Sequence, residues 1–210
     1  MKTNTETNEP KDVGKIQFWN RVQLLLVLAV FVAPIAGAYF YKPTSFINYG
    51  DLYTPARLVP NLVMQLVSAD EAQTVELDSF RRQWIFLVTA SDVCSDACEE
   101  NILKMRQLRF MQNNNMKRIR TVVMQTGITA ENAIDLSAKF SPVEVYSVAT
   151  DEFIQWTKVL KIEGVPIEAE KDRLYIIDPS GNLMISYPAT ADPSYIKKDI
   201  KRLLKTSQIG

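Results

Sequence analysis

The chain has 210 residues and contains no histidine. This absence excludes histidine-based acid–base catalysis, Ser–His and Cys–His nucleophile pairs, and the imidazole ligands on which most zinc and non-haem iron sites depend. An excess of positive charge is also missing, because 24 basic residues balance 24 acidic ones. The composition therefore does not indicate nucleic-acid binding. Length and composition fit one globular domain of ordinary size with a short appendage.

Cysteine is scarce, since Cys94 and Cys98 are the only two in the chain. They allow one disulfide or one dithiolate site. Residues four apart within a helix have Cβ atoms about 5–6 Å apart, whereas a disulfide requires about 3.5–4.5 Å. A bond between them therefore requires Cys94 to lie in the loop or first turn at the start of the helix.

One long apolar run, residues 22–41, carries no formal charge. Twenty helical residues span about 30 Å, which is the thickness of a bilayer's hydrocarbon core. Trp19 and the aromatic residues 39–41 lie at its two ends, where aromatic rings favour the membrane interface. The alternative is a cleaved signal peptide, whose apolar core would be shorter, at about 7–15 residues. We expect a retained transmembrane helix.

Basic residues are distributed unequally around this run. Residues 1–21 contain four, whereas only Lys42 and Arg57 follow in the next twenty positions. The positive-inside rule predicts a cytoplasmic tail at 1–21 and an exported part at 42–210. The sequence lacks an Arg-rich amphipathic leader, which favours a bacterial inner membrane with a periplasmic domain over a mitochondrial location. An oxidising compartment would allow a disulfide.

The exported part divides into a proline-containing linker or lead-in at 42–79 and a domain at 80–210. In the domain, apolar runs of strand length alternate with amphipathic helical patterns. This order predicts an α/β fold with a mostly parallel sheet and a late antiparallel hairpin. We expect strands at 84–90, 118–125 and 143–149, helices at 94–111, 128–140 and 150–162, a hairpin at 174–187, and a last helix that begins near Asp192.

Several of these features together resemble one family. A buried strand is followed by a CxxxC motif at a helix start, then by the hairpin LYIIDPSGNLM, and an anchor precedes them all. Over roughly residues 70–206 the chain is similar to the Sco/SenC family of membrane-anchored cytochrome c oxidase assembly proteins. The resemblance implies a thioredoxin-like fold and a role in oxidase assembly. It also implies an oxidase subunit or a copper chaperone as partner at the inner membrane.

In that family two cysteines and one later histidine hold copper. Carried over, the resemblance assigns Cys94 and Cys98 to the thiolate pair, and the histidine position falls at Glu170. Cu(I) prefers thiolate, imidazole or thioether ligands to a carboxylate. Met124 and Met184 are alternative third ligands, although core packing also explains both of them.

Four functions of the cysteine pair stay open: a redox-active dithiol that acts on a metallochaperone or oxidase subunit, a copper site, a static disulfide in a non-enzymatic scaffold, and a fold whose surface alone binds a partner. Acidic residues crowd the motif at positions 92, 96, 99 and 100, and the first basic residue after the motif is Lys104. Their negative charge disfavours a thiolate. We therefore expect a stable disulfide and a weak oxidant.

Overall fold

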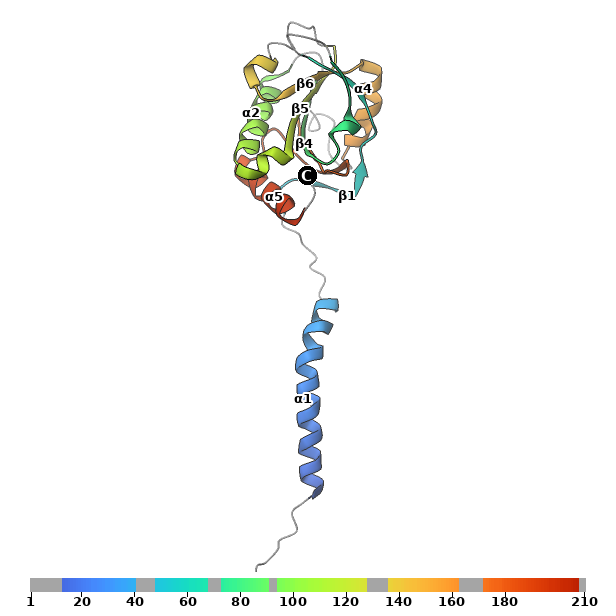
Figure 1. Cartoon of the computed structure of the whole chain (residues 1–210), viewed down its shortest axis with the longest axis vertical. Helices are drawn as coiled ribbons and strands as arrows, with labels where there is room; N and C mark the ends of the chain where they lie inside the picture. The colour runs from blue at the N-terminus through green and yellow to red at the C-terminus, as the bar shows by residue number, and fades with distance from the viewer. Residues whose placement is uncertain are drawn as a thin grey trace, which may run out of the picture. The chain divides into compact units, whose positions relative to one another are not determined.

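The N-terminal part forms a single long helix. The computed structural model describes residues 13–40, 48–67, 73–90, 94–127, 136–162 and 172–207. Helix α1 (Val13–Phe40) has 28 residues and includes Pro34. Its stretch Gln17–Gly37 is long and apolar enough to cross a membrane, and Figure 1 shows α1 as one long helix. The helix matches the predicted span, and the chain divides into two compact units at residue 47.

The second unit is built on one eight-stranded sheet. Only the pairs β4–β5 and β5–β6 are parallel, and the five other neighbouring pairs are antiparallel. In spatial order the strands are β1 (Asp51–Leu58), β8 (Asn182–Tyr187), β7 (Leu174–Ile177), β4 (Trp84–Ala90), β5 (Ile119–Gln125), β6 (Glu144–Ser147), β2 (Val63–Leu66) and β3 (Gln73–Glu76).

The α/β class and the late hairpin predicted from the sequence are confirmed, but the description of the sheet as mostly parallel was imprecise. The reason lies in residues 51–76, which the sequence indicated only as a lead-in. Strand β1 pairs with β8 at one edge, and the hairpin β2–β3 extends the other edge beyond β6. These largely exposed strands are rich in polar residues, and β1 includes Pro55, so their pattern does not stand out as that of a sheet.

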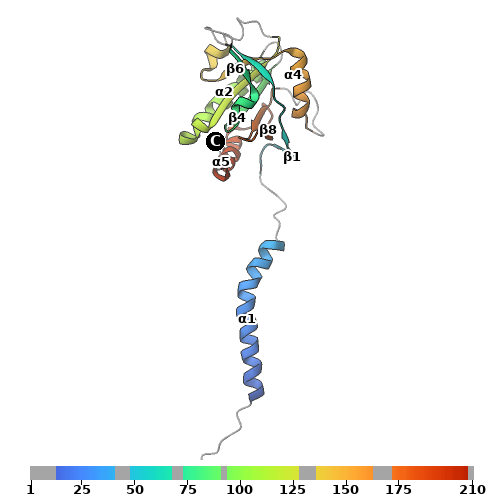
Figure 2. The ribbon, with the colours of Figure 1, turned by 45° about the vertical axis from the view of Figure 1, so that its right-hand side comes forward.

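Helices cover both faces of the sheet. Helix α2 (Asp96–Phe110) and helix α5 (Pro193–Thr206) pack on one face, whereas α4 (Thr150–Trp156) and the 3-10 turns η1 (Leu77–Phe80) and η3 (Thr157–Leu160) pack on the other (Figures 1 and 2). We call these the α2/α5 face and the α4 face. Strand β4 lies at the centre, and almost all of its residues are buried. Each large apolar side chain buried there contributes about 1.5–3 kcal/mol.

The described helices and strands follow the predicted ones closely. The helix expected at 128–140 is seen at 136–140, and its first part lies outside the described residues. A 3-10 turn, η2 (Asn113–Arg118), connects α2 to β5. The last helix begins where the sequence indicated, because Asp192 caps it by accepting a hydrogen bond from the Ser194 N–H at 2.7 Å.

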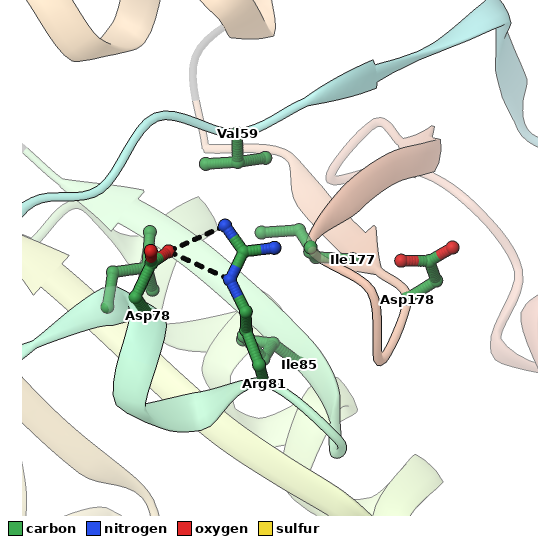
Figure 3. A pocket seen from close by; sticks show the side chains of 8 residues that line it. Val59, Asp78, Arg81, Ile85, Ile177 and Asp178 are labelled. Atoms are coloured by element: carbon green, nitrogen blue, oxygen red, sulfur yellow. Dashed lines mark hydrogen bonds and ion pairs between the residues drawn. The ribbon is translucent and has the colours of Figure 1, made fainter. Parts of the chain in front are cut away.

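The late hairpin turns at Asp178–Asn182, and Arg81, which precedes β4, contacts this turn. The Asp178 carboxylate accepts hydrogen bonds from the backbone N–H groups of Ser180 and Asn182 at 2.9 and 2.8 Å. Arg81 pairs with Asp78 and donates to the Ser180 carbonyl, and Figure 3 shows its guanidinium lying between Asp78 and the hairpin. Arg81, Asp78 and Asp178 line a small pocket of about 10 Å³ near the start of β4. It is a packing feature at the opposite end of that strand from the cysteines.

Candidate functional site: a disulfide at the start of helix α2

Cys94 and Cys98 are joined in a disulfide, with their Cα atoms 5.4 Å apart. Ser95 is the N-cap of α2, so Cys94 lies just outside the helix and Cys98 lies in its first turn. This is the arrangement that the four-residue spacing requires, because the two residues could not be bridged within regular helix. The disulfide follows directly after the buried strand β4, at its carboxyl end.

The two cysteines differ in their access to solvent. Cys98 is fully buried in the core of the α2/α5 face, at 0% exposure, whereas Cys94 is only partly buried against the same core. Attack by a thiolate from another molecule is therefore less hindered at Cys94 than at Cys98. The chemistry open to the pair is exchange through Cys94, with Cys98 as the sulfur that leaves and returns.

A polar network fixes the backbone around the disulfide. The Cys98 N–H donates to Ser95 Oγ at 3.1 Å, and the Ser95 hydroxyl donates to Asp172 Oδ2 at 2.9 Å. Asn101, which is buried, donates from its side-chain amide to the Asp172 carbonyl. Asp172 itself has a left-handed backbone with φ of 54°, which is uncommon for a residue other than glycine. These contacts tie the start of α2 to the chain just before β7.

The acidic residues around the motif are partly neutralised. Lys139 approaches Glu99 at 2.6 Å, and Lys104 approaches Glu100 at 2.8 Å. Asp96 is exposed, and Asp92 lies outside the described residues. Lys139 is 40 residues from Glu99, so no short-range sequence pattern indicates this pairing. The negative charge that faces the disulfide is therefore weaker than the sequence alone indicates.

Asp172 is a neighbour of the disulfide that the sequence did not indicate. It lies two residues after Glu170, where the family resemblance puts the third copper ligand. Its position two residues before the hairpin strand was the only available signal. Its contact with Ser95 depends on the fold, because 77 residues separate them.

None of the predicted third copper ligands lies beside the cysteines in the part of the chain that the structure describes. Glu170 lies outside the described residues. Met124 is fully buried in the core of the α4 face, across the sheet from the disulfide, and Met184 packs at the margin of the α2/α5 core. Among described residues, no three cysteine or acidic side chains lie together as a metal site. The disulfide form offers no thiolate, so copper binding at Cys94 and Cys98 requires the reduced pair, and the predicted ligand Glu170 lies outside the described residues.

Solved structures with similar folds include thiol proteins of two kinds. Apo Sco1 from Thermus thermophilus superposes with a TM-score of 0.58 at 13% identity, over 76% of this chain and 99% of that chain. BsSco, described as a member of the Sco family of cytochrome c oxidase assembly proteins with a disulfide switch, gives 0.55 at 14%, over 72% and 93%. A putative protein disulfide isomerase from Bacteroides thetaiotaomicron gives 0.53 at 14%, over 71% and 89%.

These likenesses confirm, at the level of the fold, the resemblance to Sco proteins that the sequence motifs indicated. No curated protein matches the chain in sequence. One family model matches residues 84–207, more than half of the chain, and that region includes both cysteines, Asp172 and helices α2 and α5. The chain therefore belongs to the family described as the transmembrane-like, thioredoxin-like, C-terminal domain.

Proposed function

We propose that this protein is a membrane-anchored thiol–disulfide exchange protein that assists the assembly of cytochrome c oxidase on the periplasmic side of a bacterial inner membrane. The observation that carries the proposal is the unequal burial of one disulfide, with Cys94 partly exposed and Cys98 fully buried. A purely structural disulfide would not need a partly exposed cysteine. Its five-residue ring also adds little stability.

The exchange reaction follows from this arrangement. In the reduced chain, the Cys94 thiolate attacks a disulfide of a client and displaces one client sulfur as a thiolate, which gives a mixed disulfide. The Cys98 thiolate then attacks Cys94, which releases the second client sulfur and forms the intramolecular disulfide. The client gains two electrons and the pair loses two. A protein dithiol on the same side of the membrane must renew the reduced form.

The start of α2 favours this second step. The partial positive charge of a helix N-terminus stabilises a thiolate in the first turn, where Cys98 lies. The carboxylates of Asp96 and Asp172 oppose it, which keeps the pair on the reducing side. We therefore assign it to the reduction of a client disulfide rather than to the oxidation of client thiols.

Different observations support the proposed membrane anchor and the proposed client. Helix α1 has the length and hydropathy of a membrane span, and the excess of basic residues before it favours a cytoplasmic N-terminus. The oxidase client is proposed from the similarity to Sco folds. The ligand set Cys94, Cys98 and Glu170 stays a prediction, and the exchange reaction does not depend on it.

The test uses the full chain in membranes, in two variants that each keep one of the two cysteines. Cys98→Ser leaves Cys94 free and should accumulate a mixed disulfide with a client, visible as a band that dithiothreitol removes. Cys94→Ser, the matched control, leaves only the enclosed sulfur and should give no such band. Absence of a band with both variants would support a static disulfide in a scaffold and would refute the exchange reaction.

A further inference from the structure

The solvent side of helix α5 is basic. Its apolar residues Ile196, Ile200 and Leu204 face the core, whereas four lysines at positions 197, 198, 201 and 205 are exposed along the opposite side. No salt bridge joins Lys197, Lys201 or Lys205 to an acidic side chain in the part of the chain that the structure describes. The proposed exchange reaction makes no use of this surface.

Two half-exposed tyrosines lie beside these lysines. The rings of Tyr49 and Tyr195 stack with centroids 4.3 Å apart and planes inclined by 9°. Lys198 Nζ lies 5.6 and 5.1 Å from the two ring centroids. Stacked tyrosines next to lysines combine an apolar body, hydroxyl groups and positive charge, a combination that suits the headgroup region of a membrane.

The chain enters the domain at this same surface. The Tyr49 N–H donates to the buried Asp199 carboxylate of α5 at 2.8 Å. Gly50 follows so close to β8 that a Cβ atom there would lie 2.7 Å from the Ser186 carbonyl oxygen. The first residues of the domain are therefore fixed against α5 and β8.

Little chain separates this attachment point from the proposed anchor. Only residues 41–47 lie between the end of α1 and Asn48, and seven residues reach at most about 25 Å when fully extended. The proposed span therefore keeps Tyr49 and the lysines of α5 within a short reach of the bilayer surface. The linker also allows the lysines to come within about 10 Å of the headgroup layer, the distance beyond which salt screens such charges.

We propose that the four lysines of α5, with Tyr49 and Tyr195, form a surface that binds the anionic headgroups of a lipid bilayer. This surface orients the domain on the membrane and sets the height at which Cys94 meets a client. The proposal rests on the proposed anchoring by α1, and it is independent of whether the disulfide exchanges.

The test places the full chain in lipid nanodiscs of two compositions, phosphatidylcholine alone and phosphatidylcholine mixed with phosphatidylglycerol. A neutral acetylating reagent modifies lysines, and mass spectrometry gives the rate at each position. We expect Lys197, Lys198 and Lys201 to react at least threefold more slowly in the anionic discs. The difference should disappear in 1 M salt. Lys158 and Lys161, which are exposed on the α4 side of the sheet, should react equally in both.

A variant pair separates binding from general effects of the lipid. In the triple variant Lys197→Gln, Lys198→Gln and Lys201→Gln, Lys205 should lose its protection in anionic discs. The matched variant Lys158→Gln with Lys161→Gln should keep it. Equal labelling of the α5 lysines in both compositions would overturn the proposal, and so would protection that needs an added acidic protein. Reduction of the disulfide by dithiothreitol is measured on the same discs, so a disulfide that stays oxidised while the α5 lysines are protected would refute the exchange reaction alone.

Discussion

Two carboxylates fasten the helices of the α2/α5 face, and they do so in different surroundings. Asp172 accepts a hydrogen bond from the Ser95 hydroxyl at the partly exposed start of α2. Asp199 is buried under α5 and accepts from the Tyr187 hydroxyl at 3.1 Å and from the Tyr49 N–H. The chemistry is similar, but only Asp172 lies beside a reactive group. The comparison indicates that the buried cluster of Asp199, Tyr187 and Tyr49 stabilises the fold. The partly exposed cluster of Asp172 and Ser95 affects the redox equilibrium of the disulfide.

The buried cluster should carry more stability than the exposed one. Asp199→Ala leaves the buried Tyr187 hydroxyl and the partly buried Tyr49 N–H without this carboxylate, and a buried donor without a partner costs about 1–3 kcal/mol. We expect the free energy of unfolding to fall by about 3 kcal/mol, as measured in urea. Asp172→Ala, the matched variant, should cost about 1 kcal/mol, because water can reach its partners. Equal losses would remove the distinction between the two clusters.

The buried cluster should also limit stability at high pH. Burial, and then the negative charge of Asp199, raise the pKa of Tyr187 well above its usual value. Burial, with Glu144 second, does the same for the pKa of Tyr146. A raised pKa in the folded state means that this stability is complete below about pH 10 and is lost above it, by about 1.4 kcal/mol per pH unit for each tyrosine.

Urea unfolding measured between pH 9 and pH 11.5 tests this expectation. The native chain should lose stability steeply above pH 10, and Tyr187→Phe should make the slope shallower. Ser95→Ala changes the other cluster and should leave the slope as it is in the native chain. A native slope that Tyr187→Phe does not alter would contradict the assignment.

The exposed cluster should show a modest effect on stability when its hydroxyl is removed. Ser95→Ala takes away the N-cap of α2 and the contact with Asp172, and loss of an N-cap costs about 1 kcal/mol. Ser95→Asn keeps a side-chain acceptor and should restore most of the loss. Thermal unfolding of the two variants would show whether the cap or the mere presence of a side chain matters.

The sequence predicted the local part of this comparison and missed the distant part. The start of α5 at Asp192, the helix after β4 and the side-chain bonds of Asp178 in the hairpin turn follow from residues within a few positions of one another. The contacts Ser95–Asp172, Glu99–Lys139 and Tyr49–Asp199 join residues that are 40 to 150 positions apart. No short-range pattern specifies such pairs, since they depend on which strands become neighbours.

The sheet edges illustrate the same limit. The apolar run of β4 identifies a central strand, because such a run is buried on both faces. The edge strand β1 includes Pro55 and alternates only weakly, so its pairing with β8 depends on the completed sheet. The proposed ligand Glu170 came from the family resemblance and stays a prediction, because the residue lies outside the described ranges.

The smallest expected effect concerns the charge of Asp172. Asp172→Asn keeps an oxygen that can accept from Ser95 but removes one negative charge near Cys98. A thiolate becomes less unfavourable, so a larger fraction of the pair should be reduced at a fixed glutathione ratio. Asp192→Asn makes the same change at the start of α5, where no cysteine lies, and should leave the reduced fraction as it is. Equal shifts in both variants would point to a general effect of charge.

The account depends most directly on access to the disulfide through Cys94 alone. Folded full-length chain is treated with dithiothreitol at pH 7.5, and the variants Cys98→Ser and Cys94→Ser, each with one free thiol, are treated with oxidised glutathione; all samples are quenched with acid and mapped by mass spectrometry. We predict reduction of the folded native chain within minutes to hours, a glutathione adduct on Cys94 in Cys98→Ser and no adduct on Cys98 in Cys94→Ser. A disulfide that dithiothreitol reduces only after urea has unfolded the chain would contradict the account.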